Sequence, residues 1–432
     1  KPSIEKRHQP LCQANCPLGV NVQAYVALTR VGRYKEALDL IRRDNILPGI
    51  CGRICTHPCE LACRRGELDA PLAIRDIKRF VADQGRAARQ HSPTQGNTPC
   101  SPQGERSQPH APAVAVIGSG PAGLAAAADL ARFGYATTIF EKEPRAGGVL
   151  RYGIGPYRLP RDILDEEIEV IRELGVHILT NTPIDFATGL EDLKKRFAAI
   201  IVTTGAWTDR KLEVPGEELD AVEGCIAFLA RLYRDEINDL RERVAVIGDG
   251  NAAFDAARAL VRVGAQTTVL SWFPESLIPA LAEEVKAARD EGVEILCSRQ
   301  VTAFLGNGGK LTGLRCMPTK PGEPDANGVP WPVVIPGAEP SDLAFDRAIV
   351  AIGQVGGTVC VTKSDRLNTT SSGCIRIDGS YRTNRPVVYA AGDVTDDIYR
   401  QAVTAAGMGC MAALEAERYL AHAETHAAAA AE

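Results

Sequence analysis

The sequence lacks the features that mark membrane, secreted and nucleic-acid-binding proteins. Its apolar stretches all fall well short of the roughly 20 residues that a membrane span needs, and residues 1–10 are polar, without the apolar segment of a signal peptide. It has no long run of lysine and arginine, and its formal net charge is -5. We therefore expect a cytoplasmic protein that binds neither nucleic acid nor a membrane surface.

Several catalytic motifs are also missing. The sequence contains no C-x-x-C pair, which argues against a dithiol reductase of the thioredoxin reductase type, and no nucleophile elbow or metalloprotease motif. What it does contain is 432 residues that are 45% hydrophobic. This is enough material for the cores of roughly two to four ordinary domains.

Composition and periodicity divide the chain. Residues 85–112 are rich in Pro, Ser, Gln and Gly and predict a linker. Before it, residues 22–43 and 73–83 have helical spacing of apolar side chains. After it, residues 113–117 and 243–247 are short apolar strands that each open into a glycine-rich turn and an alanine-rich helix. This repeat, offset by 130 residues, predicts two dinucleotide-binding domains.

The first turn reads VAVIGSGPAGLAAA and places Gly118, Gly120 and Gly123 in the G-x-G-x-x-G pattern. The first glycine permits the tight turn, the second lets the backbone approach a pyrophosphate, and the third lets the helix pack on the strand. Glu141 ends the next strand, where a carboxylate accepts hydrogen bonds from an adenosine ribose. The alternative is a glycine turn with only a structural role.

The second turn reads VAVIGDGNAAFDAA, with Gly248 and Gly250 in place and Ala253 at the third position. The strand after it ends in Ser271, so neither a ribose-binding acid nor an arginine for a 2'-phosphate follows. This favours NADH over NADPH, unless an arginine such as Arg299 folds back. The alternative is that this domain has lost its nucleotide.

Two sites of unequal pattern suggest a permanent flavin on one and a visiting nicotinamide on the other. Near the end of the chain, VVYAAGDV places Gly392 and Asp393 after an apolar strand and before a helix of small residues. An aspartate there can bind the ribityl hydroxyls of a flavin, and the helix N-terminus can stabilise negative charge on the reduced ring.

The segments VAVIGSGPAGLAAA, GGVLRYGI, IIVTTGA, IVAIGQ and YAAGDV, together with Glu141, resemble the two-nucleotide flavoprotein family typified by the glutamate synthase small subunit. The flavin half of dihydropyrimidine dehydrogenase and the large subunit of ferredoxin:NADP transhydrogenase are similar. The resemblance implies FAD on the first repeat and NAD(P)H on the second, with the FAD domain resuming near Phe345. Where NADPH-using relatives generally place Tyr-Arg-Arg, this chain has Ser271, Trp272 and Phe273.

We therefore expect an α/β protein with two Rossmann-like domains, the FAD domain interrupted by the NAD domain, preceded by a small α-helical cysteine-rich iron-sulfur domain. The expected bounds are an iron-sulfur domain at 1–90, a linker at 91–112, an FAD domain at 113–240 and 346–420, an NAD(P)H domain at 241–345 and a frayed tail at 421–432. The expected cofactor-binding residues are Gly118, Ser119, Gly120, Pro121, Ala122, Gly123, Glu141, Lys142, Gly148, Arg151, Gly205, Gly248, Gly250, Asn251, Ala252, Ser271, Gly353, Gly392 and Asp393.

Six of the thirteen cysteines lie within the first 63 residues: Cys12, Cys16, Cys51, Cys55, Cys59 and Cys63. Every step within a group is four residues, but Gly52 and Pro58 argue against one continuous helix that presents them as a stripe. Zinc, with His57 as a further ligand, is an alternative, although no C-x2-C knuckle is present. Thiolates from distant segments beside a flavoprotein favour a [4Fe-4S] cluster. The other seven cysteines, Cys100, Cys225, Cys297, Cys316, Cys360, Cys374 and Cys410, are dispersed and are expected to be core or surface thiols.

The family resemblance implies two clusters, but with a defect. Similar flavoproteins have a further cysteine pair ahead of the position of Cys12, and they take a Gln or Glu ligand from the helix that here reads IRDIKRFV, at the position of Lys78. An ammonium cannot ligate iron. We expect one cluster, held by four of the six cysteines, unless a segment upstream of Lys1 restores the pair.

The predicted function is electron transfer, in either direction, between NADH, FAD and iron-sulfur centres. No residues remain for an organic-substrate domain, so a partner subunit should convert the substrate: an amidotransferase-type synthase, a polyferredoxin, or a tungsten or molybdenum aldehyde oxidoreductase. Residues 1–90 carry sixteen Lys and Arg against nine Asp and Glu, which suits an anionic cluster, an acidic partner or a solvated face. The alternatives are a non-catalytic assembly subunit and a free-standing NADH:acceptor reductase.

Overall fold

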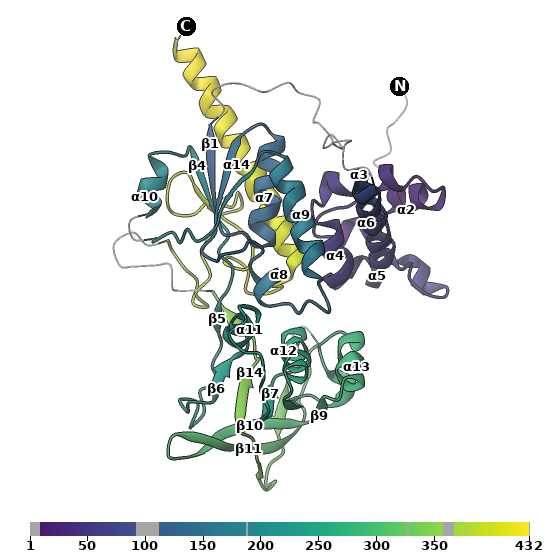
Figure 1. The fold of residues 1–432 in the computed structure, drawn as a ribbon, viewed down its shortest axis with the longest axis vertical. Helices are drawn as coiled ribbons and strands as arrows, with labels where there is room; N and C mark the ends of the chain where they lie inside the picture. The colour runs from purple at the N-terminus through teal and green to yellow at the C-terminus, as the bar shows by residue number, and fades with distance from the viewer. Residues whose placement is uncertain (1–8, 92–111, 187–188, 326–327, 357–366, 432) are drawn as a thin grey trace. The chain divides into compact units, whose positions relative to one another are not determined.

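The computed structural model describes residues 9–91, 112–186, 189–325, 328–356 and 367–431. The chain forms two compact units, shown with their element labels in Figure 1. The first unit comprises residues 1–151, 156–205 and 356–432, and the second comprises residues 152–155 and 206–355. Of the described helices, none is long and apolar enough to cross a membrane.

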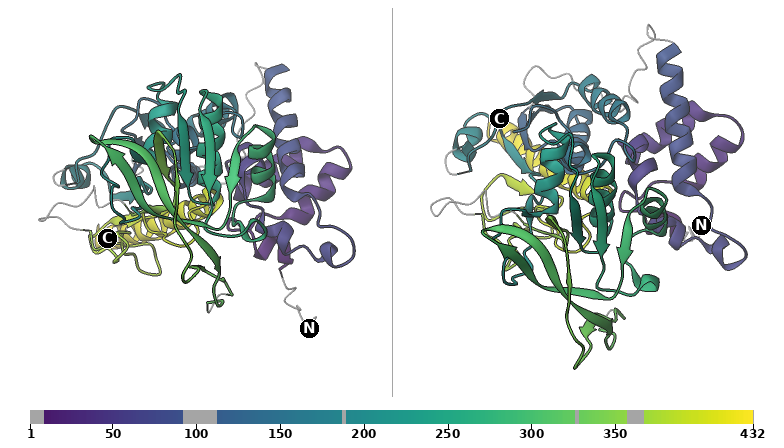
Figure 2. Two further views of the ribbon diagram at one scale, coloured as in Figure 1. Left: turned by 90° about the horizontal axis from the view of Figure 1, so that it is seen from below. Right: turned by 60° about the horizontal axis from the view of Figure 1, so that its bottom comes forward.

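The N-terminal part of the first unit is helical, and its helices stay together in every view (Figures 1 and 2). The elements are α1 (Leu11–Ala14), α2 (Val22–Arg30), α3 (Tyr34–Asp44), α4 (Pro48–Ile54), α5 (Pro58–Leu61), the 3-10 turn η1 (Arg64–Glu67) and α6 (Ile74–His91). Their apolar faces meet around Tyr25, Ile41 and Val81. Helix α6 continues through residues 85–91, the start of the segment whose composition predicted a linker. Gly85 lies where α6 packs on α3, because a Cβ there would come within 2.1 Å of Leu38.

The rest of the first unit is built on a five-stranded parallel sheet in the order β16-β4-β1-β2-β3. The strands are β1 (Ala113–Ile117), β2 (Ala136–Phe140), β3 (His177–Leu179), β4 (Ala199–Val202) and β16 (Val388–Ala390). The helices are α7 (Pro121–Arg132), α8 (Val149–Tyr152), α9 (Arg161–Glu173), α10 (Gly189–Lys194) and α14 (Ala402–Ala431). Helix α14 includes nearly all of the expected tail, because alanine has the highest helix propensity of any residue.

The second unit repeats this plan with the parallel sheet β6-β14-β7-β8-β9. These strands are β6 (Val222–Gly224), β7 (Arg243–Ile247), β8 (Gln266–Leu270), β9 (Glu294–Leu296) and β14 (Arg347–Val350). A second sheet contains β10 (Arg299–Asn307), β11 (Lys310–Pro321), β12 (Pro332–Val334) and β13 (Ser341–Leu343), and β5 (Thr208–Asp209) pairs with β15 (Gln354–Val355). The helical elements are α11 (Cys225–Tyr233), α12 (Asn251–Arg262), η2 (Glu275–Leu277) and α13 (Ala282–Asp290).

The predicted fold class is confirmed, but the compact units divide the chain at other places than the expected domain bounds. Residues 206–240 and 346–355, assigned from the sequence to the FAD domain, lie in the second unit. The physical reason is strand pairing: β6 and β14 join the sheet of β7, which the sequence of those short strands does not reveal.

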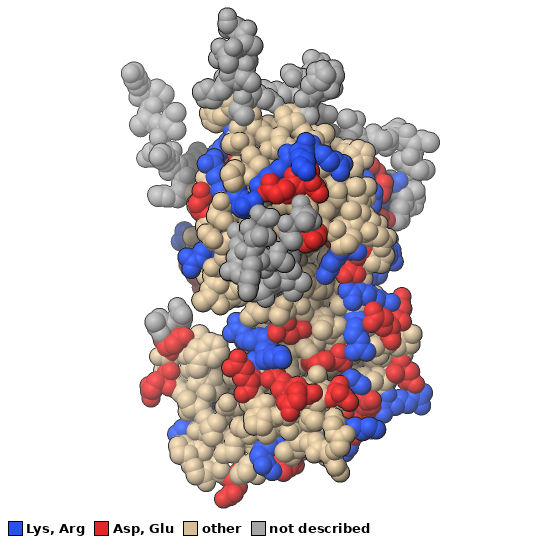
Figure 3. All heavy atoms as spheres, turned by 90° about the vertical axis from the view of Figure 1, so that its left-hand side faces the viewer, with Lys and Arg blue, Asp and Glu red and all other residues tan. Residues whose placement is uncertain are grey.

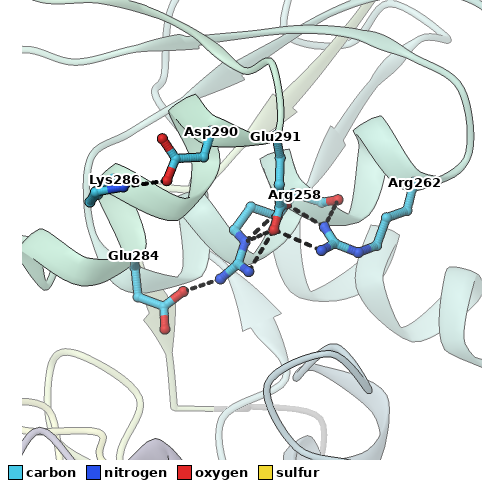
Figure 4. A network of polar contacts seen from close by, with 6 residues as sticks. All are labelled: Arg258, Arg262, Glu284, Lys286, Asp290 and Glu291. Carbon is cyan, nitrogen blue, oxygen red and sulfur yellow. Dashed lines mark hydrogen bonds and ion pairs between the residues drawn. The ribbon is translucent and has the colours of Figure 1, made fainter.

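Helix α12 is held against α13 by a network of charged side chains (Figure 4). The buried Arg258 contacts Glu284 at 2.5 Å and Glu291 at 2.7 Å, and Arg262 also pairs with Glu291. Hydrogen bonds from Arg262 and Arg258 lower the pKa of Glu291 to about 2, so the carboxylate stays ionised. Elsewhere, acidic and basic side chains are interspersed on the face drawn in Figure 3.

One buried carboxylate joins the helical part of the first unit to its sheet. Glu167 of α9 accepts a hydrogen bond from the Gly49 N–H (3.2 Å) at the first turn of α4, and the Arg42 guanidinium lies 3.9 Å away. A carboxylate at a helix N-terminus satisfies otherwise free N–H groups. Burial nevertheless raises the pKa of Glu167 to about 7.

This contact predicts a pH-dependent stability. Because the folded protein favours the neutral carboxyl, the stability from Glu167 is fully present below its unfolded pKa and is lost as pH rises through about 7, by on the order of 3 kcal/mol. Glu167→Gln should therefore raise the apparent melting temperature over that of the wild type at about pH 8, and by less at about pH 5. The control is Glu166→Gln, a more exposed carboxylate of the same helix. A wild-type-like pH profile for Glu167→Gln would contradict the assignment.

Candidate functional site

The first glycine turn lies at the carboxyl end of β1, at the edge where the strands of a parallel sheet present ligand sites. Gly118 has φ +105°, and a Cβ there would lie 2.6 Å from the Thr203 carbonyl oxygen. A Cβ at Gly123 would lie 2.0 Å from the Gly118 carbonyl oxygen. Around Gly120, by contrast, no heavy atom outside this residue and its two chain neighbours lies within 4 Å of where a Cβ would be. The open position is the one that the sequence assigned to the pyrophosphate.

Helix α7 begins at this turn with Pro121 and Ala122 as its first residues. Proline suits the first helical position because its missing N–H needs no partner there, and the remaining free N–H groups favour an anion. Glu141 follows β2, as predicted, and is buried. Its Oε2 accepts hydrogen bonds from the N–H and hydroxyl of Ser119, and its Oε1 accepts one from the Glu143 N–H (2.9 Å).

Four further predicted residues lie in the same unit. Gly148, at φ +54°, packs against Gly120, where a Cβ would come within 2.9 Å of the Gly120 Cα. Arg151 is buried; it donates from Nε to the Ala146 carbonyl and pairs with Asp165, and its Nη1 has no partner among the described residues. Lys142 is half-exposed beside Glu143, and Gly205 has φ +74° beyond the end of β4.

Asp393 follows Gly392 at the end of β16, the strand that pairs with β4. Its Oδ1 is buried and has no partner among the described residues, and burial raises its pKa to about 6. A buried carboxylate oxygen without a donor is unfavourable, so it marks a place for a ligand that carries hydroxyl or N–H groups. The open Gly120 position and the Asp393 oxygen together fit a flavin nucleotide.

The second turn has the same backbone geometry. Gly248 has φ +135°, and a Cβ there would lie 2.3 Å from the Ala351 carbonyl oxygen, whereas Gly250 is as open as Gly120. Asn251 and Ala252 begin α12, and the Asn251 side chain accepts from the Leu281 N–H (2.9 Å). Gly353 lies beyond β14 with φ +103° and open space around it.

Asp249, which lies between these two glycines, was missed from the sequence. Its Oδ2 accepts a hydrogen bond from the Ser271 hydroxyl (3.0 Å), and the Ser271 oxygen accepts one from the Phe273 N–H (3.1 Å). Ser271 is fully buried at the end of β8. The end of β8 therefore carries a carboxylate, supplied by the turn instead of the strand. In the sequence, the position of Asp249 between Gly248 and Gly250 was the signal that could have marked it as a site residue.

The six N-terminal cysteines are distributed over the small helices. Cys12 lies in α1, Cys51 in α4 and Cys59 in α5, while Cys16, Cys55 and Cys63 lie at or beyond helix ends. The predicted break within the second group is confirmed: α4 ends at Ile54, and His57 adopts a left-handed conformation with φ 44° before α5.

Several of these thiols are close enough to influence one another. Burial raises the pKa of Cys51 and Cys59 to about 12, the neighbouring Cys55 thiol raises it further in both, and the Lys78 ammonium opposes the rise. Cys16 likewise raises the pKa of Cys55 and Cys59. Cys63 and Cys16 raise the pKa of Cys12. The Cys55 sulfur also accepts a hydrogen bond from the His57 N–H (3.3 Å).

Among the described residues, no three Cys, His, Asp or Glu side chains are disposed to hold a metal ion as they stand. The donor set nevertheless fits an iron-sulfur cluster, because thiols dominate it and a buried cation lies beside them. The remaining cysteines described, Cys225, Cys297, Cys316, Cys374 and Cys410, are free thiols in other parts of the chain; Cys100 and Cys360 lie outside the described residues.

Two nucleotide-type glycine turns on parallel sheets, in one chain with a cysteine-rich helical domain, define the class of an iron-sulfur flavoprotein oxidoreductase. The comparison with family models agrees: residues 112–409 match the pyridine nucleotide-disulphide oxidoreductase family, and residues 6–90 match dihydropyrimidine dehydrogenase domain II, 4Fe-4S cluster. The chain belongs to the pyridine nucleotide-disulphide oxidoreductase family and carries an N-terminal 4Fe-4S domain.

The names of three curated relatives of this chain describe subunits or chains of enzymes. It is 39% identical over 426 residues to the NADP(+)-dependent formate dehydrogenase subunit beta of Moorella thermoacetica, which covers 95% of this chain and 60% of the relative. It is 36% identical to the NADPH-Fe(3+) oxidoreductase subunit beta of Geobacter sulfurreducens, covering 81% and 52%. The chain thus spans little more than half the length of these two. The glutamate synthase [NADPH] small chain of Mycobacterium tuberculosis is 30% identical, covering 95% and 86%.

Solved structures share the fold. FprA of Mycobacterium tuberculosis in complex with NADPH has a TM-score of 0.62 at 17% identity, covering 74% of this chain and 86% of that one. Lactococcus lactis thioredoxin reductase has a TM-score of 0.54 at 24% identity, covering 72% and 99%.

The geometry of the first turn predicts the effect of a single substitution. Gly120→Val should fold normally, because its φ of -70° is unstrained and no atom lies near the new Cβ, but it should block the pyrophosphate and give colourless protein. Gly379→Val is the matched control, at another glycine with open space. Flavin absorbance per protein measures the outcome. A fully yellow Gly120→Val protein would contradict the site.

Proposed function

We propose that this chain is the flavoprotein electron-transfer subunit of a larger oxidoreductase, which binds FAD at the first turn, NADH at the second and one [4Fe-4S] cluster in the N-terminal domain. The observation that carries the proposal is the pair of open glycine positions, Gly120 and Gly250, each at the start of a helix, in a chain that also holds six cysteines within its first 63 residues. The relatives' names, which describe subunits, support the larger complex.

When bound, the flavin supplies the change from two-electron to one-electron chemistry: it takes a hydride from NADH and gives up electrons singly. The chain's own residues bind and orient the two nucleotides. The N–H groups at the starts of α7 and α12 receive the pyrophosphates, Glu141 receives the adenosine ribose, and Asp393 receives the hydroxyls of the flavin chain. The partner then supplies the substrate chemistry or a ferredoxin-like iron-sulfur centre, and a cytoplasmic location remains a prediction.

The preference for NADH is the part of the proposal on which this chain differs from its relatives, whose names specify NADP(H). Asp249 and Ser271 at the end of β8 support it. Arg299, the arginine that could reverse the preference, lies beside the same strand end: its backbone N–H donates to the Ser271 carbonyl oxygen (2.9 Å), and its Nη1 donates to the Ser298 carbonyl oxygen (3.3 Å). A ribose with free hydroxyls can donate to a carboxylate there, whereas a 2'-phosphate would face like charge.

Stopped-flow reduction of the flavin by each nucleotide tests this preference. A missing charge-assisted phosphate contact is worth roughly 1.5 to 3 kcal/mol, so NADH should be favoured by a factor of about 10 to 150. Asp249→Asn should reduce the ratio of the NADH rate to the NADPH rate, because the amide removes the charge that would repel a 2'-phosphate while its oxygen still accepts from the Ser271 hydroxyl. Equal or better rates with NADPH in the wild type would end the claim, and no bleaching by either nucleotide would favour an assembly subunit.

Metal analysis tests the cluster. Iron and acid-labile sulfide should each be near four per FAD after anaerobic purification, because one set of four thiols can be assembled from the six. Cys55→Ser or Cys59→Ser should remove them while FAD remains, and Cys297→Ser, in the second unit, is the control that should keep both. Eight irons per flavin would show two clusters, and zinc would show a different site.

A further inference from the structure

Lys78 is a lysine in a place where a lysine is unfavourable. It is 5% exposed, and its ammonium lowers the pKa of the thiols of three cysteines, Cys51, Cys55 and Cys59. No carboxylate lies within 4.0 Å of it in the described part of the chain. Lysine is almost never fully buried unless it is paired with an anion. The groups that can supply this negative charge to Lys78 are the neighbouring cysteine sulfurs, once they are ionised.

The position of Lys78 is fixed by helix packing. It lies four residues after Ile74 and three before Val81, both fully buried, so it occupies the core-facing stripe of α6. One residue away, α6 and α4 approach so closely that a Cβ on Gly52 would come within 2.7 Å of the Arg79 Cα. Lys78 is therefore held beside the cysteine-bearing helix and cannot swing to the surface without separating α4 from α6.

We propose that Lys78 is the counter-charge of the cysteine-held cluster, a residue that stabilises the reduced cluster and raises its reduction potential without ligating iron. The proposal rests on the proposed function, in which the cluster takes one electron from the reduced flavin. That electron makes the cluster and its four thiolates one charge more negative, and no bond to Lys78 forms or breaks. A buried positive charge favours the more negative state, and net charge near the sulfurs is a known determinant of cluster potential.

The test is an EPR-monitored redox titration of the anaerobically purified full chain, with mediator dyes and no nicotinamide. Lys78→Met keeps the length of the side chain and removes its charge, and Lys78→Arg keeps the charge. Arg79→Met is the matched control, because it removes one positive charge from the same helix at a side chain that is 55% exposed. Lys78→Met should lower the midpoint potential by at least 59 mV, a tenfold change in the one-electron equilibrium. Lys78→Arg and Arg79→Met should each shift it by less than half of that.

An unchanged potential in Lys78→Met, or an equal shift in Arg79→Met, would overturn the proposal. If Lys78→Met loses its iron but keeps FAD, retention of the cluster by Lys78→Arg supports the charge requirement, and loss in both variants shows a merely structural role and overturns it. A wild-type chain without a cluster overturns it as well. Flavin bleaching by NADH is recorded separately, so a failure of the proposed function is distinguished from a failure of the role of Lys78.

Discussion

Backbone packed directly on backbone around the β1–α7 turn is the constraint on which the first unit depends. Ala122 lies at its centre: a Cβ on Gly409 would come within 2.1 Å of the Ala122 carbonyl oxygen, and one on Gly392 within 2.7 Å of the Ala122 Cβ. No side chain fits at either glycine, so α14 and the end of β16 must lie against the start of α7. This contact joins segments nearly 300 residues apart in the sequence, and it brings Asp393 to the same sheet edge as Gly120.

The second unit combines the same backbone plan with different polar side chains. Gly248 and Gly250 reproduce the tight turn and the open position, so both sites can admit a pyrophosphate. What differs is the polar group beside the second strand: a glutamate supplied by the strand end in the first unit, and an aspartate supplied by the turn itself in the second. In the proposed function, the glycines admit a dinucleotide at each turn, and the nearby side chains select which one.

Local rules predicted much of this structure. The two turns, Glu141 after β2 and the helix break before Pro58 follow from glycine, proline and strand patterns within about thirty residues. The sequence did not predict the contacts that join distant segments: the hydrogen bond from the Ser271 hydroxyl to Asp249, the pairing of β6 and β14 with β7, or the buried Glu167 at the start of α4. Each depends on which surfaces become buried together, and periodicity within one segment carries no information about that.

The cysteine domain is where these long-range contacts bear most directly on electron transfer. Glu167 holds the first turn of α4, and Gly407 of α14 lies so close to Pro17 that a Cβ would come within 2.6 Å of its carbonyl oxygen. The two cysteine groups thus each lie beside a segment that packs on α9 or α14, the helices next to the five-stranded sheet of the first unit. Both groups belong to the same compact unit as that sheet. Packing within that unit therefore sets the spacing between the flavin site and the thiols. The buried charge of Lys78, held by the same packing, then contributes to the energy of an electron that reaches them.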